Sequence, residues 1–383
     1  MAGNPVPIPA KTGPHAKILC IDDLRIAATK KLPAGARDFY NSGSTDQLTL
    51  HENTSAYNKY RLRPRVLVDV SGCNPSTTCF ASPVSFPLGV SPAGLQAMAH
   101  PSGELATARA CARRGVSMCI SSFANYSVSE IRAAGLGVRG DMRHAMQLYT
   151  MKDRALEEKI LRKAEAEGCS AVFLTADSPV LGVRYNEWRN DFRTPKGLNF
   201  PALEWDSRDI QGRTHDDGFM SFNDDGHNWA RDIPWLRSVT KMEIWIKGVL
   251  TAEDTLKAIE MGCDGVLVSN HGGRQLDGVA ATIDALPECV AAAAGRIRIH
   301  VDGGIRSGTD MFKALALGAE HVWVGRPAIW GLAYDGEKGV DLMLDTFYNE
   351  FKRCMQLTGC NSVKDITKAC LGVVRSDGPL ARL

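Results

Sequence analysis

An apolar run that leads into a polar, glycine-rich loop decides how this sequence folds: Asp264-Gly265-Val266-Leu267-Val268-Ser269-Asn270-His271-Gly272-Gly273-Arg274-Gln275. The short, continuously apolar run is typical of a buried strand in a parallel sheet. His271 and Arg274 follow where that strand ends, and the glycines between them let a ligand approach the backbone. Histidine can accept a proton near neutral pH, and arginine can grip a carboxylate. The stretch indicates chemistry on a small acid, although one His near one Arg is more often part of a solvated loop.

The same alternation of strand and helix runs through most of the chain. The other apolar runs that predict strands are 87–90, 116–120, 145–149, 171–175, 244–247, 297–301 and 321–324. Helical patterns follow them, at 103–114, 128–134, 153–167, 252–261, 283–294, 308–317 and 343–355. Eight strands that alternate with helices predict an α/β fold, a closed (β/α)8 TIM barrel. The rival is an open doubly wound sheet, but the Gly-rich turn usual after its first strand is replaced here by Ser91-Pro92-Ala93-Gly94.

Three segments depart from this alternation. Residues 1–83 are expected to form an N-terminal arm and helical cap, with helices over 21–42, broken at Leu32-Pro33, and over 53–60. Residues 84–360 form the predicted barrel, and 361–383 a C-terminal helix and tail. Within the barrel, residues 198–232 are polar and follow the fourth strand, which predicts a long, mobile, lid-like loop.

Composition narrows the classes of partner. The 383 residues carry a formal net charge of +2, so neither nucleic acid nor a membrane is expected as a partner. The 11 cysteines contain no C-x-x-C pair, which argues against a metal site and for a reducing compartment. The C-terminal Ala381-Arg382-Leu383 is a variant of the Ser-Lys-Leu peroxisomal address. It predicts a peroxisomal protein, or otherwise a cytoplasmic one.

Polar and glycine residues gather after the predicted strands, where barrel enzymes build their active sites. The glycines after the seventh and eighth strands suit a phosphate held by backbone N–H groups and a helix N-terminus. Lys247 would place a positive charge beside an electron-accepting ring, and together these features indicate FMN. The set comprises Pro92, Ala93, Gly94, Ser121, Ser122, Phe123, Gln147, Tyr149, Thr175, Asp177, Arg184, Lys247, His271, Arg274, Asp302, Gly303, Gly304, Arg306, Gly325 and Arg326.

The stretch 269–275 resembles the active-site signature of the FMN-dependent 2-hydroxy acid oxidase and dehydrogenase family, which includes glycolate oxidase and lactate oxidase. The resemblance implies a TIM barrel that binds FMN, takes a small 2-hydroxy acid and forms a homo-oligomer, a tetramer. It extends, in the family's order, to Met98-Ala99-His100-Pro101, Gln147-Leu148-Tyr149, Thr175-Ala176-Asp177, Ile246-Lys247-Gly248, Asp302-Gly303-Gly304-Ile305-Arg306-Ser307-Gly308-Thr309-Asp310 and Gly325-Arg326-Pro327.

The resemblance also implies roles for the residues that carry the chemistry. His271 would be the catalytic base, and Asp177 would stabilise the imidazolium that forms. Tyr149 would hydrogen-bond the substrate hydroxyl or the developing carbonyl. Lys247 would stabilise the reduced flavin ring.

Binding roles follow from the same resemblance. Arg274 and Arg184 would bind the substrate carboxylate with help from Tyr40. The remaining cofactor contacts would come from Pro92, Ala93, Gly94, Ser121, Gln147, Thr175, Ser269, Asp302, Gly303, Gly304, Arg306, Gly325 and Arg326.

Three positions depart from the glycolate-oxidase pattern. Phe123 stands where Trp is usual, Asn125 where Thr is common, and Pro92-Ala93-Gly94 where Pro-Thr-Ala is usual. Because Phe lacks the indole N–H and some bulk, the pocket is expected to take a substrate with a longer or different side chain than glycolate, with Phe123 bordering it.

We therefore expect oxidation of an (S)-2-hydroxy acid to a 2-oxo acid, with O2 reduced to H2O2. The sequence contains no haem domain before the barrel and no apolar membrane segment, which favours O2 over a cytochrome or quinone. Two alternatives stay open: a dehydrogenase that passes electrons to another acceptor, and a non-catalytic flavin-binding protein. An FMN barrel of another type would need a cysteine nucleophile at a strand end, and no strand end carries one.

Overall fold

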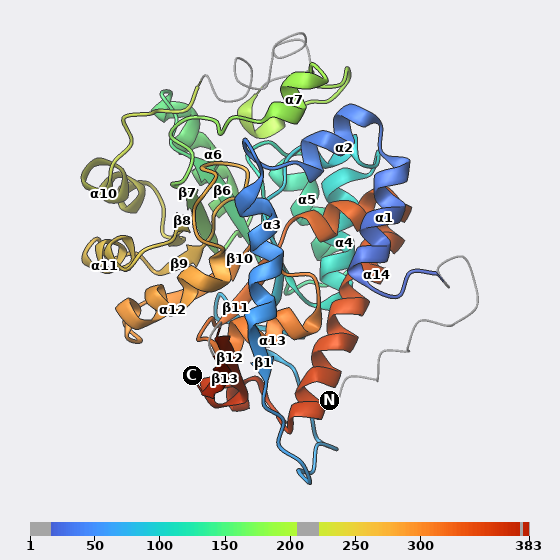
Figure 1. The fold of residues 1–383 in the computed structure, drawn as a ribbon. Helices are drawn as coiled ribbons and strands as arrows, with labels where there is room; N and C mark the ends of the chain where they lie inside the picture. Colours follow the sequence, from blue (N-terminus) through green and yellow to red (C-terminus); the bar gives the residue numbers. More distant parts are fainter. Residues whose placement is uncertain (1–16, 205–221, 376–377, 383) are drawn as a thin grey trace.

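The computed structural model describes residues 17–204, 222–375 and 378–382, and it confirms the predicted TIM barrel (Figure 1). Eight parallel strands close on themselves in the order β10-β11-β4-β5-β6-β7-β8-β9. The last strand meets the first where Val324 pairs with Val90. The barrel strands are β4 Leu88–Val90, β5 Ser117–Ile120, β6 His144–Tyr149, β7 Ala171–Thr175, β8 Glu243–Val249, β9 Gly265–Val268, β10 Arg298–Asp302 and β11 His321–Val324.

Helices surround the barrel because each buries an apolar face against the strands. Local signals fix several of their ends: the side chains of Thr251 and Ser307 cap the N-termini of α11 and α13, and Gly115, at φ +68°, ends α4. Among the described residues, no helix combines the length and apolarity that crossing a membrane requires. The surrounding helices are α4 Gly103–Arg114, α5 Val128–Leu136, α6 Arg154–Ala166, α10 Trp229–Val239, α11 Ala252–Glu260, α12 Thr282–Ala293, α13 Gly308–Ala316 and α14 Arg326–Thr358.

Aromatic side chains fill the barrel interior. A hairpin of β2 (Thr77–Cys79) and β3 (Ser82–Val84) precedes the first barrel strand and inserts Phe80 into the barrel. The Phe80 ring centroid lies 5.8 Å from that of Trp245 and 6.0 Å from that of Trp323. The sequence analysis missed this hairpin, because two three-residue strands carry little periodicity.

The N-terminal arm packs against both the barrel helices and the strand ends. It comprises α1 Ile21–Lys31, α2 Ala34–Asn41, α3 Leu48–Ser55, η1 Ala56–Lys59 and β1 Tyr60–Leu62, so the helix expected at 53–60 begins earlier than predicted. α1 lies beside the long α14 (Figure 1). α3 approaches the loop after β10 so closely that a Cβ on Gly304 would lie 1.7 Å from the Asn53 carbonyl oxygen. The arm therefore closes over the rim that carries the predicted site.

Two predictions of secondary structure are corrected. The predicted helix after residue 361 is wrong: the segment forms η4 Val363–Asp365, η5 Lys368–Cys370 and strands β12 Leu371–Arg375 and β13 Gly378–Arg382. β12 lies between β1 and β13, since its β-branched residues and the unpaired edge of β1 favour a sheet. The predicted loop 198–232 is too long, because residues 201–203 form the short helix η3 and 229–232 the first turn of α10, capped by Asn228. Residues 205–221 of that prediction lie outside the described residues.

Two buried histidines make the barrel sensitive to acid. Burial lowers the pKa values of His144 and His321 to about 3, from the ordinary 6.5. Both stay neutral in the folded protein, whereas the unfolded chain takes up their protons once the pH falls below about 6.5. The free energy of unfolding should fall between pH 6.5 and 4, by on the order of 3 kcal/mol per histidine at pH 4. Thermal melts across this range test the effect. A melting temperature that stays constant over this pH range would contradict the effect. So would a His321→Asn variant whose melting temperature falls with acid as steeply as that of the wild type.

Candidate active site

A cavity at the carboxyl ends of the strands brings most of the predicted site residues together. Three of them, Ser122, Asp177 and Ser269, are not among the residues that line it, and Ser269 Oγ accepts a hydrogen bond from the His271 backbone N–H at 3.2 Å. Ser269 therefore supports the loop. The predicted residues that line the cavity are Tyr40, Pro92, Ala93, Gly94, Ser121, Phe123, Gln147, Tyr149, Thr175, Arg184, Lys247, His271, Arg274, Asp302, Gly303, Gly304, Arg306, Gly325 and Arg326.

The His271 loop is folded tightly. Three consecutive residues have left-handed backbone conformations, with φ of +57° for His271, +64° for Gly272 and +74° for Gly273. Glycine adopts this conformation without cost, which explains the pair that follows the histidine. For His271 itself the conformation is strained, as is common where a side chain must be aimed at a site.

His271 is held by Asp177 from the loop after β7. His271 Nδ1 lies 2.9 Å from Asp177 Oδ1, and Ser178 Oγ donates to the same carboxylate oxygen at 3.0 Å. Burial lowers the pKa of His271 to about 4, although Asp177 acts in the opposite direction. Burial would raise the pKa of Asp177, but His271 and Lys247 lower it to about 2. At neutral pH a neutral imidazole thus donates Nδ1–H to an ionised carboxylate, which leaves Nε2 with a lone pair that can take a proton.

Lys247 supplies a buried positive charge at the end of β8. The side chain is 4% exposed. Burial alone would lower the pKa of its ammonium, but the carboxylates of Asp177 and Asp302 outweigh that effect and raise it. Lys247 therefore remains charged and can stabilise negative charge that develops in the cavity.

Aromatic residues form one wall of the cavity. The Phe123 ring centroid lies 5.7 Å from that of Tyr149 and 5.6 Å from that of Phe222. Burial raises the pKa of Tyr149, so its hydroxyl stays protonated and can donate a hydrogen bond. The Tyr40 hydroxyl donates to the Leu95 carbonyl at 2.5 Å. The predicted contact of Tyr40 with a substrate carboxylate requires that bond to open.

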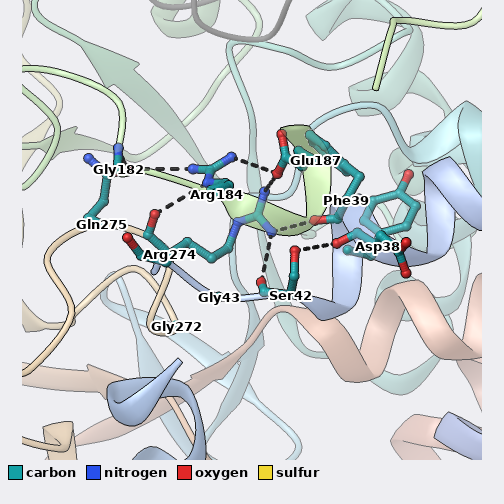
Figure 2. A network of polar contacts seen from close by, with 12 residues as sticks. Asp38, Phe39, Ser42, Gly43, Gly182, Arg184, Glu187, Gly272, Arg274 and Gln275 are labelled. Carbon is teal, nitrogen blue, oxygen red and sulfur yellow. Dashed lines mark hydrogen bonds and ion pairs between the residues drawn. The ribbon is translucent and has the colours of Figure 1, made fainter. Parts of the chain in front are cut away.

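Arg184 and Arg274 face the cavity together, and we call this pair the carboxylate clamp (Figure 2). The Nη1 of Arg274 donates to the backbone carbonyls of Phe39 and Ser42, so the arm holds this side chain. Arg184 Nε donates to the Arg274 carbonyl at 3.3 Å. Two guanidinium groups in one wall suit a carboxylate ligand.

Glycines and one uncapped helix end form the part of the cavity that was predicted to hold a phosphate. Gly325 precedes α14, and no side chain among the described residues caps that helix. Its first-turn N–H groups are therefore oriented as phosphate-binding helices require. Arg326 lines the cavity, but its three nitrogens donate to the carbonyls of Tyr40, Ser42 and Gly272 at 2.8 to 3.0 Å. In this structure Arg326 joins the arm to the His271 loop.

The sequence analysis missed several residues of the site. Ser178, Leu181 and Gln275 line the cavity, and Gln275 bridges loops by donating to the carbonyls of Asp177 and Val180. Glu187 contacts both arginines of the carboxylate clamp. The spacing of Glu187 from Arg184, three residues along a short helix, is the signal that could have indicated it.

Comparisons with known proteins show which family the chain belongs to. Residues 28–373 match the FMN-dependent dehydrogenase family. The chain is 46% identical over 348 residues to glycolate oxidase 3 of Arabidopsis thaliana, covering 89% of this chain and 92% of that protein. It is 42% identical over 359 residues to human 2-hydroxyacid oxidase 1, covering 92% and 96%. The solved structure of mandelate oxidase with (S)-2-phenylpropionate superposes with a TM-score of 0.83 at 34% identity, covering 95% of this chain and 99% of that one.

The contact between Asp177 and His271 predicts a measurable shift. Because the carboxylate raises the pKa of His271 against the effect of burial, Asp177→Asn should lower that pKa further below about 4, by about one unit or more. NMR titration of histidine-labelled protein reads the value directly. An unchanged or raised His271 pKa in the variant would show that the carboxylate does not act on this ring.

Proposed function

Because this chain belongs to the FMN-dependent dehydrogenase family, we propose that it oxidises (S)-2-hydroxy acids to 2-oxo acids and transfers the electrons to O2, which becomes H2O2. The observation that carries the proposal is the placement of a neutral His271 beside the carboxylate clamp in one cavity. Oxygen as acceptor is supported by the relatives, which are named as glycolate, 2-hydroxyacid and mandelate oxidases.

The residues present fit FMN. Asp302 lines the cavity, and its Oδ1 is buried with no hydrogen-bond partner among the described residues. A buried acceptor of this kind suits a polar group of a ligand. Gly303, Gly304 and Gly325 line the cavity with their backbone, and Lys247 supplies a cation in the same wall. These residues, with Arg306 and the N-terminus of α14, would hold the cofactor. When bound, FMN would accept the two electrons together with the second hydrogen that leaves the substrate, the first being the proton that His271 takes.

The chain's own residues account for binding and proton transfer. The carboxylate clamp would orient the acid through its carboxylate. His271 Nε2 would accept the proton of the 2-hydroxyl group as the carbonyl forms, and Asp177 would stabilise the resulting imidazolium through Nδ1–H. Asp177 would act on the substrate only through His271, so it is a positioning residue. The Tyr149 hydroxyl would donate to the substrate oxygen.

Two further parts of the proposal rest on the sequence. One is a homo-oligomer, a tetramer. The other is peroxisomal location through Ala381-Arg382-Leu383. In the structure Ala381 and Arg382 pair with Val373 and Gly372 in the β12–β13 ladder, and Leu383 lies outside the described residues. Recognition of the tripeptide would require this last strand to leave the sheet.

Removal of the base gives the first functional prediction. His271→Ala should retain bound FMN but lose turnover of 2-hydroxy acids by about 10²- to 10⁴-fold, since the proton acceptor is gone. Oxygen uptake with peroxide detection measures the loss, and absorbance confirms the flavin content. The matched control is His51→Ala, an exposed histidine of α3, which should behave as wild type. Near-normal turnover in His271→Ala would place the base elsewhere.

Phe123 gives a prediction about the substrate. With Phe rather than the larger Trp in the aromatic wall, kcat/KM should be higher for acids with longer side chains than for glycolate. Phe123→Trp should shift that preference toward glycolate by roughly ten-fold or more, since one methylene in an apolar pocket discriminates by about that factor. A panel of 2-hydroxy acids of rising chain length, with oxygen uptake recorded, tests it. A wild-type preference for glycolate that Phe123→Trp leaves unchanged would contradict this role.

A further inference from the structure

We propose that Glu187 is the positioning residue of the carboxylate clamp: it holds Arg184 and Arg274 together and neutralises one of their two charges, so that the clamp is matched to a single carboxylate. This inference rests on the proposed function, because it concerns the same acid-binding site. The inference concerns a residue that the sequence analysis did not identify, and it predicts how many negative charges a well-bound substrate carries.

One oxygen of Glu187 lies between the two arginines (Figure 2). Oε1 is 3.3 Å from Arg184 Nη1 and 3.6 Å from Arg274 Nη2. Arg184 is the residue before helix α7 (Tyr185–Arg189), which carries Glu187, whereas Arg274 comes from the loop after β9. The carboxylate therefore joins two strand ends that are distant in the sequence. It is 3% exposed, so solvent screens these contacts little.

Further hydrogen bonds of the clamp go to uncharged acceptors. Arg184 Nη2 donates to Gln275 Oε1 at 3.5 Å, and its Nε donates to the Arg274 carbonyl. Arg274 Nη1 donates to the carbonyls of Phe39 and Ser42. These bonds orient each guanidinium but do not offset its charge. Glu187 is a carboxylate that both arginines share, and it offsets their mutual repulsion.

Two consequences follow for acid binding. Side chains already held in place do not have to be ordered when the ligand arrives, which strengthens binding. Two guanidinium groups and one resident carboxylate also leave a net charge of one, which a monocarboxylate neutralises. A dicarboxylate would bring a second negative charge that this wall does not match. The clamp is thus tuned to monocarboxylic 2-hydroxy acids.

Glu187→Gln tests the proposal, because it removes the charge and keeps the shape. The KM for the preferred 2-hydroxy acid should rise about ten-fold, with kcat within about three-fold of wild type. The ratio of dissociation constants for acetate and oxalate, read from the flavin spectrum without turnover, should shift about five-fold or more toward oxalate. A structural role alone would leave that ratio unchanged. The matched control is Asp191→Asn, which removes a side chain that is 75% exposed in the same segment and should change neither quantity.

Glu187→Asp keeps the charge but moves it by one methylene. Its acetate-to-oxalate ratio should equal that of wild type, while KM rises about three-fold. If Glu187→Gln does not fold, the KM of Glu187→Asp tests the proposal instead. An unchanged or lower KM in either variant, or an unchanged anion ratio in Glu187→Gln, would overturn the proposal. The anion titration also separates it from the proposed function: if no 2-hydroxy acid is oxidised by the wild type, the function fails while acetate and oxalate still report on the clamp.

Discussion

The hydrogen bond between Asp177 and His271 is the interaction on which the rest of the site depends. The two residues follow β7 and β9, which are separated in the barrel by β8. β8 passes between them at Gly248, where a Cβ would lie 2.6 Å from the Asp177 Cβ. Closure of the barrel and a glycine at this one position therefore bring the carboxylate to the imidazole. The bond fixes the tautomer of His271 and leaves Nε2 free to face the cavity.

The N-terminal arm is the second requirement. Arg274 and Arg326 donate to carbonyls of α2 and the turn after it, and the Asn53 and Asn270 side-chain amides exchange two hydrogen bonds of 2.8 Å. Ser44 N donates to the Gly273 carbonyl at 2.8 Å. The arm thus fixes the loop that carries His271 and the clamp residue Arg274. A barrel without these contacts would leave Arg274 and Arg326 without their backbone acceptors in the arm.

The sequence predicted the parts of this architecture that are written in local pattern. Each barrel strand is a short apolar run, and the glycines at 272–273 indicated a loop that a ligand can approach closely, which the structure shows to be a left-handed turn. What the sequence did not predict depends on contacts between distant segments. Phe80 enters the barrel from a hairpin too short to show periodicity, and β12 is a strand because it pairs with β1. Ser269 faces His271 rather than the cavity, and Glu187 reaches Arg274 from another loop. Neither arrangement has a one-dimensional signature.

The central claim is that this cavity moves electrons from a 2-hydroxy acid to a bound flavin. The most direct measurement is the flavin absorbance near ~450 nm after anaerobic addition of an (S)-2-hydroxy acid to the purified holoenzyme, followed by admission of air. The account predicts that the band bleaches with the (S) acid, that the (R) enantiomer leaves it unchanged, and that oxygen restores it with release of peroxide. A band that persists with every (S)-2-hydroxy acid, or a protein that binds no FMN, would contradict the account.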